Sequence, residues 1–174
     1  AYAPVDLNHP ALLAQGGFKP TEGNPQFHQQ MVYAVAMKTI GHFEKALGRA
    51  ALWAPRYATI DGKRTSRFVR RLRIYPHALR EANAYYSPDK CALLFGYFRA
   101  SESSVGDLPG GLVFNCLSHD VVAHETTHAL LDGLHPRYKV SSSLDMLAFH
   151  EAFADIVALF QHFTIPSVLN AAIR

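Results

Sequence analysis

Two histidines and a glutamate, His124, Glu125 and His128, interrupt the otherwise apolar stretch DVVAHETTHALLDG. Three titratable side chains in a buried helix are costly unless a partner satisfies them. Residues four apart on an α-helix lie about 40° apart around its axis, so both imidazoles share one face and can each give a nitrogen to a zinc ion. Glu125 points about 100° away, which suits a base that takes a proton from a metal-bound water. The spacing predicts a zinc site with its own general base.

This H-E-x-x-H pattern is a specific signal. Ten histidines and six glutamates scattered over 174 positions predict about 0.02 chance matches. The helix that the motif requires is also indicated, because Val121, Leu130 and Leu131 provide apolar surroundings. The alternative is a pair of satisfied core histidines beside a surface glutamate.

A third ligand is available downstream, where FHEAFADIVALF places Glu151 and Asp155 four apart on one face of a second apolar helix. A catalytic zinc needs a third protein ligand and an open fourth position, and Glu151 can supply that ligand. Asp155 can accept the other ring N–H of a zinc-bound histidine and so fix its tautomer. The alternative is a polar stripe that faces solvent.

The longer pattern H-E-x-x-H-x-x-G-x-x-H is absent, because Leu131 and Leu134 occupy its glycine and last histidine positions. Three other candidates for the third ligand, with less support, are His119, Asp132 and His150.

The composition is that of one ordinary globular domain. The 174 residues are 49% hydrophobic and 18% charged, which is enough for a real core. A net charge of +3 is too weak to argue for nucleic acid, and we expect the arginine-rich segment 63–73 to be the solvated face of an edge strand.

No apolar run is long enough to span a membrane, and the opening AYAPVDLNHP shows no signal peptide. Cys91 and Cys116 are expected to be two small buried thiols.

The elements that must position these residues form an α+β domain. We expect a single domain over 1–174, with an extended arm over 1–23, a helix plus sheet over 24–116, and metal-binding helices over 117–174. The helices are expected at 24–48, 118–132 and 142–163, with a further one opening at Ser167. The strands are expected at 68–75, at 110–115, and as a pair within 83–98 joined by a turn at 87–90.

Local signals set the expected helix ends. Asn24-Pro25 indicates an N-cap followed by proline at the first helical position. Gly133 is expected to stop the H-E-x-x-H helix, and Ser142 and Asp145 have the spacing of a capping box at the start of the next. Because the last helix has barely begun when the sequence ends, we expect the chain to be a fragment of a longer protein.

Three blocks resemble the thermolysin-like gluzincins, zinc peptidases with two histidines and one glutamate as ligands. They are NAYY (83–86), DVVAHETTHALLD (120–132) and EAFAD (151–155), in the family's order and over roughly half of the chain. The resemblance implies that His124, His128 and Glu151 bind zinc. It further implies that Glu125 activates water and that Asp155 orients His124.

The same resemblance implies a way of holding substrate. Asn83 and Ala84 would lie on an edge strand that binds the backbone of an extended peptide, as peptides do when they add to an exposed sheet edge. The alternative for Asn83 is a turn or strand-end residue. The family also uses a tyrosine in the connection after the motif to stabilise the oxyanion. Tyr138 is the candidate here, with a surface tyrosine as the alternative.

The chain also departs from the family. The gap between His128 and Glu151 is a few residues longer than usual, and no following helical lobe with its catalytic histidine is present; His162 does not match it. Asp120 matches a calcium-binding aspartate, but no Asp or Glu follows Asp155. We therefore do not expect calcium, and Asp120 suits the positive N-terminal end of its helix.

The sequence thus predicts a zincin-like domain with a small, mainly antiparallel sheet packed on helices. The expected function is zinc-dependent hydrolysis of peptides or proteins by an endopeptidase. We expect no nucleic-acid or membrane partner; the oligomeric state is left open, and the family resemblance suggests secretion. The alternative is a zinc-binding but weakly active or inactive module with a binding or regulatory role.

Overall fold

A computed structural model describes residues 2–101, 109–135, 138 and 143–173. Five α-helices and one short 3₁₀ turn lie within these residues: α1 Pro10–Ala14, α2 Pro25–Leu47, η1 Asn115–Leu117, α3 His119–Leu134, α4 Leu144–Phe163 and α5 Pro166–Ala172. Six strands lie in the same part of the chain: β1 Arg56–Ile60, β2 Lys63–Arg67, β3 Arg73–Leu79, β4 Ala84–Ser87, β5 Ala92–Arg99 and β6 Leu112–Phe114.

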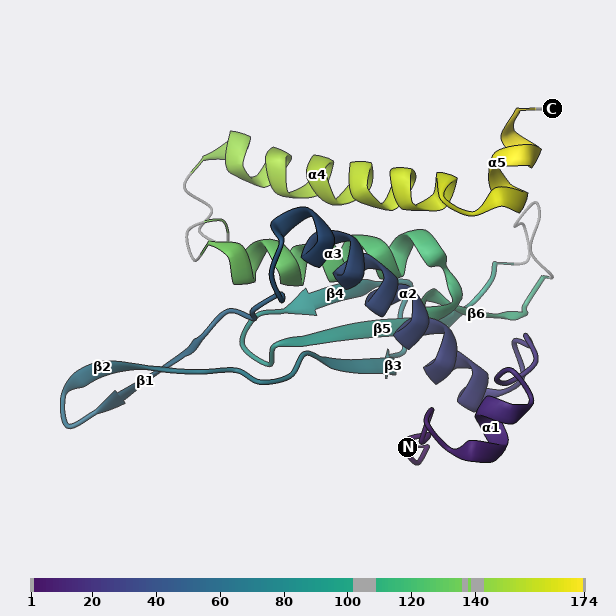
Figure 1. Cartoon of the computed structure of the whole chain (residues 1–174), viewed down its shortest axis with the longest axis horizontal. Helices are drawn as coiled ribbons and strands as arrows, with labels where there is room; N and C mark the ends of the chain where they lie inside the picture. Colours follow the sequence, from purple (N-terminus) through teal and green to yellow (C-terminus); the bar gives the residue numbers. More distant parts are fainter. Residues whose placement is uncertain (1, 102–108, 136–137, 139–142, 174) are drawn as a thin grey trace.

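The fold is a small sheet covered by helices, which confirms the predicted α+β class at that level. β5 is central: it runs parallel to β3 and antiparallel to β4 and β6, so the sheet is mainly antiparallel. α2 contacts β3, and α3 contacts β4 and β5. α4 packs along α3 on the side away from the sheet (Figure 1). The hydrophobic core joins residues of all these layers, among them Val32, Phe95, Val122 and Ala158.

Two predicted features of the N-terminal half are confirmed. The Asn24 side chain accepts a hydrogen bond from the Gln26 amide, Pro25 opens α2, and Gly48 ends it with a φ of 67°. The turn expected at residues 87–90 joins β4 to β5, and the two strands pair from Ala84↔Phe95 to Ser87↔Ala92.

The first 23 residues are not a wholly extended arm, as the sequence had suggested. α1 forms within them, because Pro10 takes the first helical position and the His9 ring accepts a hydrogen bond from the Ala11 amide. Leu12, within this turn, is buried. The abundance of proline and glycine marked the ends of a helix rather than its absence.

Residues 56–67 form a hairpin that projects from the body, β1 paired antiparallel with β2 (Figure 1). Its second strand, β2, is the first part of the arginine-rich segment 63–73. The two connecting residues, Asp61 and Gly62, have φ values of 52° and 73°. Positive φ at both central positions is the pattern of a type I′ turn, and Asp-Gly is one of its strongest sequence signals. The expected solvated strand is confirmed, because β2 is exposed along its whole length.

The strand expected at 68–75 was misplaced, since β3 covers Arg73–Leu79. It continues through Pro76, and its pairing with β5 shifts between Tyr75 and Leu79. Proline cannot donate to a strand ladder and is found at irregularities of this kind. The strand expected at 110–115 is confirmed in its centre by β6.

α3 begins where expected but does not stop at Gly133. Ser118 caps it by accepting a hydrogen bond from the Val121 amide, and the helix runs to Leu134. A Cβ on Gly133 would lie 1.9 Å from the Leu52 carbonyl oxygen. This glycine therefore permits close packing of backbone against the helix, rather than ending it.

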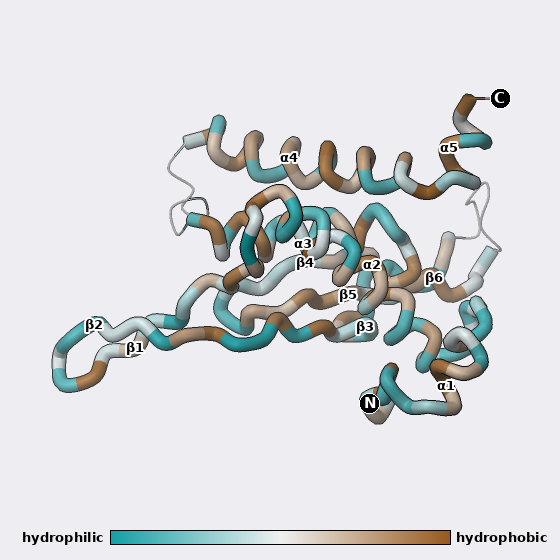
Figure 2. Tube along the Cα trace, viewed as in Figure 1, coloured by the Kyte–Doolittle hydropathy of each residue, from teal (hydrophilic) through white to brown (hydrophobic). Residues whose placement is uncertain are grey.

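α4 starts at Leu144, with Ser143 accepting a hydrogen bond from the Met146 amide. Ser142, the expected cap, lies outside the described residues. Hydrophilic and hydrophobic residues alternate along α4 (Figure 2).

No helix among the described residues has the length and apolar character needed to cross a membrane. Cys91 and Cys116 are free and buried, as predicted.

Candidate metal centre

Two neighbouring helices bring the three predicted ligands together. His124 and His128 lie one turn apart on α3, and Glu151 lies on α4, with one ligand atom of each within 4.8 Å of the others. The two Nε2 atoms are 2.9 Å apart, and the Glu151 Oε2 atom is 3.3 Å from His124 Nε2 and 3.6 Å from His128 Nε2. Two imidazoles and one carboxylate are a donor set that suits zinc in a three-ligand catalytic site.

The outer nitrogen of each histidine has its own partner. His124 Nδ1 lies 2.8 Å from the Asp155 carboxylate, the contact expected from the sequence. His128 Nδ1 lies 2.8 Å from His150 Nδ1, and the two rings are stacked with centroids 5.0 Å apart. A carboxylate that accepts Nδ1–H leaves the Nε2 lone pair of His124 free to bind a cation. His150 was one of the other candidates for the third ligand. It contacts the predicted ligand His128 and is not part of the cluster of His124, His128 and Glu151.

Burial favours the neutral form of His128 and of His150 beside it. It lowers the pKa of His128, and the neighbouring His124 lowers it further, although Glu151 opposes the shift. Burial likewise lowers the pKa of His150. A neutral imidazole has a free lone pair, which is the form that binds a metal ion.

Glu125 lies beside the cluster but makes a different contact. Its carboxylate accepts a hydrogen bond of 2.8 Å from the backbone amide of Tyr86 on β4, and the residue is only 8% exposed. Burial raises the pKa of Glu125 to about 7, against the opposing influence of His124 and the Tyr86 amide. A carboxyl group that titrates near neutral pH can both accept and return a proton there.

Two cavities meet at His124, Glu125 and Ala84; one continues along β4 and the other along the residues that precede it. One has a volume of about 360 Å³ and extends past Tyr86, His128 and Glu151. The other, of about 630 Å³, extends past Asn83 and Asp155; Asp120, Asn115 and Leu159 also line it. Together they form a cleft that runs across the ligand cluster and beside the strand.

The backbone of β4 alternates between its partner strand and this cleft. Asn83 accepts from the Gly96 amide at 2.8 Å, toward β5, whereas the Tyr86 amide points to Glu125. Because strand residues alternate in direction, Ala84 directs its N–H and C=O the same way as Tyr86, toward the cleft. Asn83 lies directly before β4, which agrees with the strand-end alternative. Its carbonyl also accepts a 2.8 Å hydrogen bond from the Asn115 side chain, and the residue lines the larger cavity.

Sequence reasoning missed a contact that ties β4 to α3. The Tyr86 hydroxyl donates a 2.8 Å hydrogen bond to Asp132, whose side chain is buried. Asp132 follows His128 by four residues, just as His128 follows His124, so helical spacing does place all three on one face. Nothing in the sequence around Tyr86, on β4, indicates that its hydroxyl contacts Asp132. Asp132, considered as a third ligand, instead orients Tyr86.

Of the remaining candidates, one lines the cleft and one does not. Tyr138 lines the smaller cavity, with its ring 6.0 Å from that of Phe149. His119 belongs to a separate cluster at the start of α3, where Asp120 lies 3.2 Å from His119 Nδ1 and 2.6 Å from His162 Nδ1. Asp120 thus joins the start of α3 to the end of α4.

Comparisons with known proteins do not identify the chain: no family model, curated protein or solved structure matches it. Function must therefore be inferred from the geometry of the cleft.

Proposed function

We propose that this chain is a zinc-dependent peptidase with a zincin-like fold of the thermolysin-like gluzincin type. One observation carries the proposal: ligand atoms of His124, His128 and Glu151 lie within 4.8 Å of one another in a cleft that also holds the Glu125 carboxylate. A buried structural histidine pair would not require a carboxylate from another helix or an open cavity beside it.

The donor set fits zinc well. Both histidines face each other through Nε2 while their Nδ1 atoms are engaged by Asp155 and His150. Three protein ligands leave a fourth position for solvent, and the cavity beside them supplies the room. Zinc bound there would lower the pKa of a coordinated water to about 7 and polarise a carbonyl group.

Glu125 is suited to move the proton. It would accept a proton from the attacking water and deliver it to the leaving amine, a transfer helped by a carboxyl pKa near the working pH. The Tyr86 amide fixes the orientation of the carboxylate, since it holds one of its oxygens at 2.8 Å. Tyr138, at the rim of the same cavity, is a candidate partner for the oxyanion.

An extended peptide fits the cleft because β4 offers the backbone groups of Ala84 at its start. Ala84 directs its N–H and C=O into the cleft, and a peptide strand pairing with them would pass over the ligand cluster. Main-chain pairing of this kind recognises the peptide backbone rather than one side chain. The proposed substrates are therefore unfolded or flexible segments of proteins.

The decisive experiment measures peptide cleavage and metal content on the same variants. The zinc-loaded chain should cleave casein, and Glu125→Gln should lose cleavage by at least about 10²-fold while keeping its zinc, because it removes the base and no ligand. His124→Ala should lose the metal as well as the activity. Glu44→Gln, a charge-removing change on α2 outside both cavities, is the matched control and should behave as wild type.

Two outcomes would overturn the proposal. A folded, zinc-loaded wild-type chain that cleaves no peptide would favour the zinc-binding module without peptidase activity. Cleavage that survives Glu125→Gln unchanged would place the chemistry elsewhere.

A further inference from the structure

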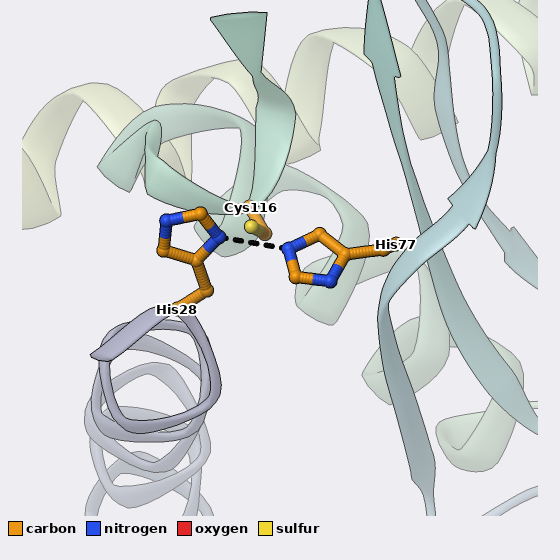
Figure 3. Close-up of side chains that lie close together, drawn as sticks. All are labelled: His28, His77 and Cys116. Atoms are coloured by element: carbon orange, nitrogen blue, oxygen red, sulfur yellow. Dashed lines mark hydrogen bonds between the residues drawn. The ribbon is translucent and has the colours of Figure 1, made fainter. Parts of the chain in front are cut away.

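A second group of metal-ligating side chains lies away from the cleft. His28 on α2, His77 on β3 and Cys116 in η1 converge, with one ligand atom of each within 4.8 Å of the others (Figure 3). His28 is 1% exposed and Cys116 is fully buried. Three elements far apart in the sequence therefore place two imidazoles and a thiol around one point in the interior.

The tautomer of His28 is set by the backbone. His28 Nε2 lies 2.8 Å from the Glu22 carbonyl oxygen, which can only accept, so Nε2 carries the proton. The lone pair of Nδ1 then points inward, where His77 Nε2 lies 2.7 Å away. A histidine whose outer N–H is held by a carbonyl is the usual arrangement around a bound metal.

Aromatic rings enclose the group. The Phe114 ring lies 4.6 Å from that of His28 and 5.4 Å from that of His77, and Tyr97 stacks on Phe114. His28 and His77 also line a cavity of about 870 Å³. An apolar shell with one open side favours ligand binding over exchange with bulk water.

We propose that His28, His77 and Cys116 form a second metal site, which takes zinc or a chemically similar divalent transition-metal ion. Imidazole and thiolate ligands together select ions of this class rather than calcium or magnesium. The three protein ligands leave a fourth position toward the cavity. The bound ion links α2, the sheet and the segment that leads into α3.

Binding requires three changes. His77 Nε2 donates the hydrogen in its 2.7 Å contact with His28 Nδ1, so His77 must shift this proton to its own Nδ1 before Nε2 can bind a metal ion. Two nitrogens on a tetrahedral zinc are on the order of 3.3 Å apart, so the rings of His28 and His77 must separate by roughly half an ångström. The Nε2 atoms of His124 and His128 are similarly close in the candidate metal centre, at 2.9 Å. Burial raises the pKa of the Cys116 thiol to about 12, so coordination must release its proton to solvent as the sulfur–metal bond forms.

Cobalt distinguishes this site from the first, because the ligands of the first include no sulfur. Co²⁺ added to the reduced, metal-free full chain should produce a near-ultraviolet sulfur-to-cobalt charge-transfer band, with about two ions bound per chain, one at each proposed three-ligand site. The His124→Ala/His128→Ala double variant should keep the band while binding one ion fewer. Cys116→Ser should lose the band, and Cys91→Ser, which removes the other buried thiol, should keep it.

His77→Asn provides a second variant that leaves both thiols in place, and its circular dichroism shows whether the fold is retained. A folded His77→Asn chain that loses the band supports the site. Wild-type protein that is folded and saturated with Co²⁺ yet shows no band would overturn it, leaving His28 and His77 as a hydrogen-bonded pair beside a buried thiol. A band that disappears with Cys91→Ser but survives Cys116→Ser would also overturn it.

Discussion

The backbone amide of Tyr86 donates a 2.8 Å hydrogen bond to the carboxylate of Glu125, which joins the middle of β4 to the H-E-x-x-H helix. The same strand borders the cleft, so the proposed base and the proposed substrate-binding edge are held in fixed relation. This hydrogen bond lowers the pKa of Glu125, but burial raises it by more, so that the pKa still reaches about 7. The site therefore has a stability cost that depends on pH.

We predict that Glu125→Gln stabilises the metal-free protein above pH 7. In the unfolded chain a glutamate titrates near 4.3, whereas in the folded protein Glu125 titrates near 7, so the folded state binds more protons between these values. Stability is therefore highest below about pH 4 and is lost as pH rises through 7, by about 4 kcal/mol at most. Glutamine cannot ionise and escapes this loss.

Urea unfolding of both chains across pH 4 to 8, in the presence of chelator, measures this difference. The gap between variant and wild type should open as pH rises and vanish near pH 4. His124, Glu151 and the Tyr86 amide face the carboxylate from α3, α4 and β4, and all are unchanged in the variant. A gap that is constant with pH would contradict the raised pKa.

Tyr86→Phe is predicted to destabilise the fold by about 1–3 kcal/mol, because it removes the hydroxyl that satisfies the buried Asp132 carboxylate. Denaturant unfolding measures the change. Tyr85→Phe on the same strand is the matched control, and as a half-exposed hydroxyl it should cost within about 0.5 kcal/mol. Equal costs for the two variants would mean that the Tyr86–Asp132 contact contributes nothing.

Asp155→Asn is predicted to weaken zinc binding through His124. Partners that orient a metal-bound histidine typically contribute 10–100-fold in affinity. Because the Asp155 side chain is 74% exposed, water can partly replace it, so we expect a loss near the lower end, about tenfold. Competition with a chromophoric chelator measures the affinity. Asp145→Asn, at the exposed start of the same helix, should leave it unchanged, and unaltered binding in Asp155→Asn would exclude the positioning role.

The parts of the fold that could be predicted from sequence are those with local signals. His124 and His128 share a helix face by spacing alone, and the Asn24 cap and Pro25 that open α2 are local signals as well. Glu151 could be proposed from its helix, but its distance from His124 depends on how α3 packs on α4. The Asp61–Gly62 turn was equally local and was overlooked because charge dominated the interpretation of that segment.

The remaining features depend on pairing between distant segments. Nothing near Tyr86 in the sequence indicates that its amide meets Glu125 and its hydroxyl meets Asp132. Likewise His28 and His77 are unremarkable in their own elements and become a possible site only when α2 packs on β3. Single-residue patterns cannot specify which strand lies beside which helix, so these contacts required the three-dimensional structure.

Gly133→Ala tests whether close packing explains the glycine inside α3. In most helices this change stabilises by roughly 0.5–1 kcal/mol, because alanine favours the helix. Here the new methyl group would lie 1.9 Å from the Leu52 carbonyl oxygen, and the clash with backbone should outweigh that gain by roughly 1–3 kcal/mol. Gly41→Ala on α2 is the matched control, because a Cβ there meets nothing within 4 Å, and it should stabilise the protein. Thermal unfolding of the two variants should therefore shift in opposite directions. If both rose, the segment around Leu52 would be able to move away from α3, and the glycine would not be required for their packing.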